Sequence, residues 1–106
     1  MFKKITFMMI LILSTGYVHA GYIDGNFLKE MSNAPITENA HYQYVGYIAA
    51  VIDMDNATNI CVDYSASMQP ILDTVQQYLI NHPSKLNVSA VGLIQSSLKQ
   101  GFPCKD

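Results

Sequence analysis

The chain has 106 residues, with six Lys and Arg residues against eight Asp and Glu residues, and a formal net charge of −2 at pH 7. None of the six basic residues is Arg, and the four Lys residues after position 20 are scattered. A nucleic-acid-binding protein needs a basic patch to neutralise phosphates, so the composition excludes a nucleic-acid partner. A chain of this length has room for one domain but not for two.

The first twenty residues are typical of a secretory signal peptide. Lys3 and Lys4 precede an apolar run from Ile5 to Leu13, and the segment ends in Val18-His19-Ala20. The uncharged stretch is too short to span a membrane comfortably and ends in small and polar residues. We expect cleavage after Ala20, no membrane association afterwards, and one helical domain over residues 21–106.

A short helix is predicted from about Asp24 to Ser32. Its apolar residues recur at helical spacing, at Ile23, Phe27, Leu28 and Met31. Asn33-Ala34-Pro35 then ends the helix, because proline lacks the amide donor and disfavours helix in the preceding residue.

A second helix is predicted after Thr37, which is a suitable N-cap residue. Its apolar residues share one helical face, at Tyr44, Tyr47, Ile48, Val51 and Ile52. A strand is the alternative, but the run is too long and lacks alternation. Gly46 costs about 1 kcal/mol relative to alanine, so we expect a neighbouring helix to approach closely at that position.

The third predicted helix has the clearest pattern. Its apolar residues form one narrow stripe, at Met68, Ile71, Leu72, Val75, Tyr78 and Leu79. Ser67 is the expected N-cap, and Pro70 lies in the first turn, where its missing amide does least harm. Asn81-His82-Pro83 ends this helix.

A fourth helix is predicted after Asn87, which is a suitable N-cap. Its apolar residues are Val88, Ala90, Val91, Leu93, Ile94 and Leu98. The pattern fades at Gln100-Gly101, as is common at the C-terminal end of a helix.

Cys61 and Cys104 are the only cysteines, and they lie on either side of the third and fourth predicted helices. A structural disulfide is the default in an exported chain, and their spacing is too wide for a CxxC redox motif. The bond would close a loop of about 44 residues, which a chain-entropy argument credits with roughly 4 kcal/mol.

The histidines beyond the signal peptide do not belong to a catalytic or metal-binding pattern. His41, near Glu38 and Tyr42, is best interpreted as part of the polar start of a helix, and His82 as the end of another. Two histidines 41 positions apart do not supply the three or four convergent ligands of a zinc site. We therefore expect no enzymatic activity and no cofactor.

Five segments, taken in order, resemble the Rap/Tai family of immunity proteins against type VI secretion amidases. They are Gly25-Asn26-Phe27-Leu28, the run from Gly46 to Asp53, Ile60-Cys61-Val62, the run from Val75 to Pro83, and Phe102-Pro103-Cys104. The resemblance implies an all-α periplasmic domain, usually a homodimer, that binds a peptidoglycan amidase and occludes its active site. Together with the cysteines, it indicates a small four-helix domain stapled by one disulfide.

In that family the loop between the last two long helices can enter the cleft of the enzyme. The matching segment runs from Asn81 to Leu86, with His82, Pro83, Ser84 and Lys85 at its tip. The first helix of a second subunit would add contacts from Asp24 to Ser32. Many members have a second disulfide near the positions of Met31 or Ser32 and of Tyr44, and its absence here implies a first helix that is held less firmly.

A different class also matches the size and the pair of cysteines. The Hde acid-stress chaperones are likewise small, exported, helical and disulfide-bonded, although they lack the Phe-Pro-Cys ending seen here at residues 102–104. The alternative function is therefore a periplasmic chaperone that exposes apolar surface at low pH.

Overall fold

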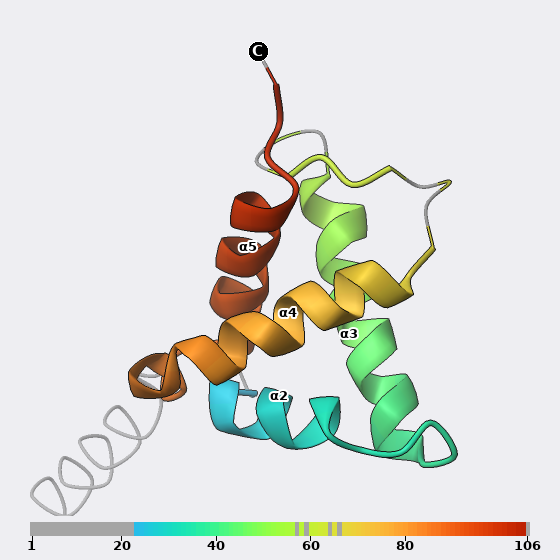
Figure 1. Cartoon of the computed structure of the whole chain (residues 1–106), viewed down its shortest axis with the longest axis vertical. Coiled ribbons are helices and arrows are strands. Elements are labelled where there is room, and N and C mark those ends of the chain that lie inside the picture. Colours follow the sequence, from blue (N-terminus) through green and yellow to red (C-terminus); the bar gives the residue numbers. More distant parts are fainter. Residues whose placement is uncertain (1–22, 57, 59, 64, 66, 106) are drawn as a thin grey trace, which may run out of the picture.

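The structure is a computed structural model that describes residues 23–56, 58, 60–63, 65 and 67–105. This part of the chain contains the α-helices α2 (Gly25–Ser32), α3 (Asn39–Asp55), α4 (Gln69–Asn81) and α5 (Ala90–Gly101), and the 3-10 helix η1 (Pro83–Lys85) (Figure 1). Strand pairing in the described residues is limited to isolated bridges. The all-α, four-helix prediction is confirmed, whereas the predicted signal peptide, residues 1–20, lies outside the described residues.

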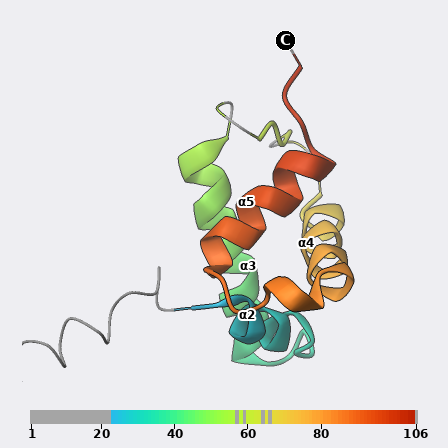
Figure 2. The ribbon, with the colours of Figure 1, turned by 90° about the vertical axis from the view of Figure 1, so that its left-hand side faces the viewer.

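Helix α4 lies across α3 and α5, and α2 covers the lower end of the bundle (Figures 1 and 2). The apolar stripes predicted for α3 and α4 face the core, where Tyr44, Ile48, Val51 and Ile52 and then Ile71, Leu72, Val75 and Leu79 are buried. Tyr47, Met68 and Tyr78 pack against this core and are only partly buried. No helix in the described ranges is both long enough and apolar enough to cross a membrane.

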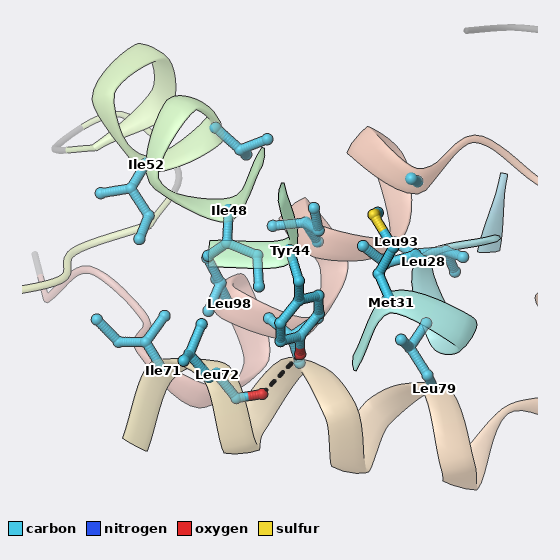
Figure 3. Packing of buried hydrophobic residues seen from close by; sticks show 14 of the residues in the cluster. Leu28, Met31, Tyr44, Ile48, Ile52, Ile71, Leu72, Leu79, Leu93 and Leu98 are labelled. Carbon is cyan, nitrogen blue, oxygen red and sulfur yellow. Dashed lines mark hydrogen bonds between the residues drawn. The ribbon is translucent and has the colours of Figure 1, made fainter. Parts of the chain in front are cut away.

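The Tyr44 hydroxyl joins α3 to α4 inside the core. It donates a hydrogen bond of 2.8 Å to the carbonyl oxygen of Leu72 (Figure 3). Burial, and secondarily the charge of Asp73, raise the pKa of Tyr44 well above its ordinary value, so the phenol stays protonated and keeps its donor role. This bond satisfies the only polar atom of a side chain that is 3 % exposed.

Three of the predicted N-caps are wrong by one or two residues. Helix α3 is preceded by Glu38 and not Thr37, and α4 by Met68, although the Ser67 hydroxyl still accepts a bond of 3.3 Å from the Gln69 amide. Helix α5 is preceded by Ser89 and not Asn87. The physical reason at α5 is tertiary: residues 86–90 bond to the start of α2 before the helix begins.

The expected close approach at Gly46 is wrong, and a close approach occurs at Gly25 instead. Gly46 is exposed, and a Cβ atom placed there would meet nothing within 4 Å. A Cβ atom at Gly25 would lie 2.8 Å from both the Cα and the carbonyl oxygen of Leu86. Glycine at position 25 therefore lets α2 touch the backbone of the α4–α5 connection.

The predicted disulfide between Cys61 and Cys104 is present, with their Cα atoms 4.9 Å apart. Around it, the Cys61 amide donates to the Phe102 carbonyl at 2.9 Å, and Ile60, which is fully buried, pairs with Pro103 in a bridge. The bond thus closes the α4–α5 pair at the end opposite to η1.

The two glycines give opposite expectations for substitution by alanine. Gly46→Ala raises the free energy of unfolding by about 0.5–1 kcal/mol, because it removes a glycine from an open helix interior. Gly25→Ala lowers it by about 1–3 kcal/mol, because the new methyl group overlaps a backbone. Urea unfolding followed by circular dichroism measures both, and equal effects at the two sites would contradict the described packing.

The disulfide closes a loop whose ends are 43 positions apart. We expect Cys61→Ala combined with Cys104→Ala to lower the free energy of unfolding by about 4 kcal/mol, because the unfolded chain gains conformational freedom. The check is the urea midpoint with and without dithiothreitol, with the double variant as the control for reductant. A wild-type midpoint that does not respond to reduction would refute this role.

Candidate functional site

The predicted tip residues His82, Pro83, Ser84 and Lys85 lie together in one tight turn where α4 gives way to η1. The Lys85 amide donates to the His82 carbonyl at 3.0 Å, and the Val88 amide donates to the Lys85 carbonyl at 3.2 Å. Pro83, Ser84 and Lys85 are exposed. We call Pro83–Lys85 the tip turn.

His82 differs from the other three residues, because its side chain serves α4. Its Nδ1 lies 2.8 Å from the carbonyl oxygen of Tyr78, so this nitrogen carries a proton and donates. The His82 and Tyr78 rings are stacked, with centroids 3.9 Å apart and planes 23° apart. The imidazole is half-buried and covers the end of the helix, and does not project from the tip turn.

The connection between α4 and α5 is tied by hydrogen bonds to the start of α2. The Gly25 amide donates to the Val88 carbonyl at 3.0 Å, and the Ala90 amide donates to the Ile23 carbonyl at 2.8 Å. The Asn26 amide and side-chain Nδ2 both donate to the Leu86 carbonyl, at 2.9 and 3.1 Å. The tip turn is therefore held in place by the first residues of the domain.

Sequence reasoning missed these supporting residues. The side chain of Asp24 also belongs to them, because its Oδ1 accepts from the Phe27 amide at 3.0 Å and caps α2. The signal available in the sequence was Gly25-Asn26 directly after a capping residue. However, nothing local indicates a partner 60 positions away.

The stretch of chain on either side of the tip turn carries little charge. Lys85 is the only Asp, Glu, Lys or Arg residue between Thr74 and Leu98. The described residues contain no group of three or more His, Cys, Asp or Glu side chains placed to hold a metal ion. The tip turn offers a hydroxyl, an ammonium group and a rigid backbone, which suit binding to another protein surface.

A hollow lies between α3 and α4, near the end of the molecule that carries the disulfide. It has a volume of about 160 Å³ and is lined by Ala49, Ile52, Asp53, Val62, Asp63, Met68 and Ile71. Asp63 accepts hydrogen bonds from the amide and hydroxyl of Ser65, which lower the pKa of its carboxyl group. The walls are mainly apolar, and the lining residues include no nucleophile paired with a base, so the hollow has no catalytic constellation.

The structure gives the His82 side chain a stabilising role that the exposed side chains of Ser84 and Lys85 do not share. We expect His82→Ala to lower the free energy of unfolding by about 1 kcal/mol, because the hydrogen bond and ring stacking to Tyr78 are lost. Ser84→Ala and Lys85→Ala should each change it by less than about 0.5 kcal/mol, because both side chains are exposed. Urea unfolding tests this, and equal destabilisation by all three would contradict the assignment.

One comparison with known proteins identifies the family of the chain. The family model of the Rap1a immunity proteins matches residues 24–104, from the capping residue of α2 to the second cysteine of the disulfide. No curated protein matches the chain. The matched span includes all the described helices, both cysteines and the tip turn. The chain belongs to the Rap1a immunity protein family.

Proposed function

We propose that this protein is a periplasmic immunity protein that binds a peptidoglycan amidase delivered by type VI secretion and occludes its active site. The family implies binding to a toxin effector, and immunity proteins are generally not enzymes. The resemblance of the sequence segments to amidase immunity proteins supports the amidase as the target. The predicted signal peptide supports the periplasm.

The observation that carries the proposal is the exposed tip turn held by hydrogen bonds on both sides. The Lys85 amide donates to the His82 carbonyl within the connection, and the connection bonds to residues 23–26. A turn that is already ordered loses little conformational entropy when it enters a cleft, so more of the contact free energy appears as affinity. The same rigidity resists rearrangement by the bound enzyme.

The tip turn also has suitable chemistry for plugging an active site. Pro83 fixes its own backbone φ angle, and the Ser84 hydroxyl can donate or accept a hydrogen bond. Lys85 supplies a cation for a carboxylate near the cleft. Inhibition is then stoichiometric and steric, and it needs no cofactor or chemical step by the immunity protein.

A homodimer is part of this proposal. Helix α2 turns Gly25, Leu28 and Met31 towards the core and leaves Asn26, Phe27 and Glu30 exposed. In a homodimer of the kind that the family resemblance implies, the exposed face of α2 from a second subunit would add contacts to the same toxin.

The disulfide suits the proposed periplasmic location, because disulfides persist in an oxidising compartment.

The test is protection and binding by a variant of the tip turn. We expect Pro83→Ala, Ser84→Ala and Lys85→Ala together to raise the Kd for the amidase encoded beside this gene by about a hundredfold, as loss of a binding hot spot does. Cells producing the toxin should then lose protection. Calorimetry and a periplasmic toxicity assay measure the two effects.

The matched control is Ser96→Ala, Lys99→Ala and Gln100→Ala, which removes exposed side chains of similar size from α5. This control should bind and protect as the wild-type chain does. Absence of wild-type binding to the adjacent amidase, combined with suppression of acid-induced aggregation of other proteins, would replace the proposal by the chaperone function.

A further inference from the structure

Three large apolar side chains are exposed at the end of the molecule that carries the tip turn. Phe27 is 45 % exposed, Ile80 is 51 % exposed and Val88 is 47 % exposed. They come from α2, α4 and the α4–α5 connection. Exposed apolar groups of this size that gather on one surface mark an interaction site, whereas single ones need no explanation.

The packing of α2 against α4 brings Phe27 and Ile80 to the same end. The two helices run in opposite directions (Figure 1), and the Gln76 Nε2 donates to the Ser32 carbonyl at 3.0 Å. Ile80 lies one helical turn from Gln76, in the direction of the tip turn. Leu28, the sequence neighbour of Phe27, lies one helical turn from Ser32 in the same direction. Both residues therefore lie near the ends of α2 and α4 that are next to the tip turn.

Val88 is attached to the same place by its backbone. Its carbonyl accepts from the Gly25 amide at 3.0 Å, and its amide donates to Lys85. Both views of the ribbon place the first turn of α2 beside the chain that joins α4 to α5 (Figures 1 and 2). Phe27, Ile80 and Val88 thus lie on the segments next to a rigid turn whose only charged side chain is Lys85.

We propose that Phe27, Ile80 and Val88 form an apolar collar around the tip turn, and that collar and Lys85 together dock the toxin. The identity of this partner rests on the proposed function. The surface fits a partner with an apolar rim around a recess and a carboxylate beside it for Lys85. A collar of this kind excludes water from the central contacts, which strengthens the charge pair that it encloses.

Charge argues for the toxin and against a second copy of the chain as the occupant. Two copies pairing through this surface about a twofold axis would each bring Lys85 to the contact. The three collar residues are uncharged and do not neutralise the two ammonium groups. An acidic site on a different protein removes this repulsion.

The experiment compares Phe27→Ser, Ile80→Ser and Val88→Ser with Ile36→Ser and Met54→Ser. The control residues are 68 % and 82 % exposed and lie outside the collar. We expect each collar variant to raise the Kd for the adjacent amidase by about tenfold or more, as hot-spot residues do. The two controls should stay within about twofold, as substitutions at energetically near-neutral positions do.

Charge reversal tests the cation separately. Lys85→Glu should weaken binding more than Lys85→Ala and abolish the dependence of the wild-type Kd on salt, while Lys99→Glu on α5 should change neither. Circular dichroism and urea unfolding confirm that each variant is folded. Should Phe27→Ser unfold α2, Val88→Ser carries the test, because Val88 lies outside the helices.

The outcomes separate the two proposals. Collar variants that bind as tightly as the wild type, while the tip-turn triple variant does not bind, overturn the collar and leave the proposed function standing. Collar variants that turn a dimer into a monomer and still bind the amidase at full affinity also overturn it. A wild-type chain that does not bind the adjacent amidase overturns the proposed function, and with it the toxin as occupant.

Discussion

The fold depends on the contact between the backbone of residues 23–26 and that of residues 86–90. Hydrogen bonds join the two segments through Gly25, Asn26 and Ala90, and the missing side chain of Gly25 lets them approach. Without this contact α2 would keep its side-chain packing and the hydrogen bond from Gln76 to the Ser32 carbonyl, and the α4–α5 connection would lose the partners of Leu86 and Val88. A single junction therefore positions both the first helix and the tip turn.

The junction and the disulfide secure opposite ends of the α4–α5 pair. One end is covalent and is reinforced by the Cys61 amide and the buried side chain of Ile60. At the other end the chain itself joins the two helices through the exposed tip turn, and hydrogen bonds to residues 23–26 and the buried side chains of Leu86 and Ala90 hold this connection. Between them, the Tyr44 hydroxyl fixes the distance between α3 and α4 by bonding to Leu72. At α2, backbone hydrogen bonds tie the helix to the α4–α5 connection.

Sequence patterns predicted the helices and the disulfide because these follow from local periodicity and cysteine count. The stripe from Ile71 to Leu79 became the buried face of α4, as its spacing predicts. The start of α5 and the role of Gly25 were not predictable in this way, because tertiary contacts decide them. His82 was placed correctly in the connection, but its stacking on Tyr78 depends on the helix ending where it does.

The long-range junction between residues 23–26 and 86–90 also determines when the tip turn can be held in place as the chain emerges and folds. Asn26 and its acceptor Leu86 are 60 positions apart, so a chain emerging from its N-terminus releases α2 long before its docking site. Contacts of such separation form late and slow folding, since the intervening loop must close first. A partly emerged chain consequently lacks the junction that holds the tip turn in place, and this junction forms only when nearly the whole domain is present.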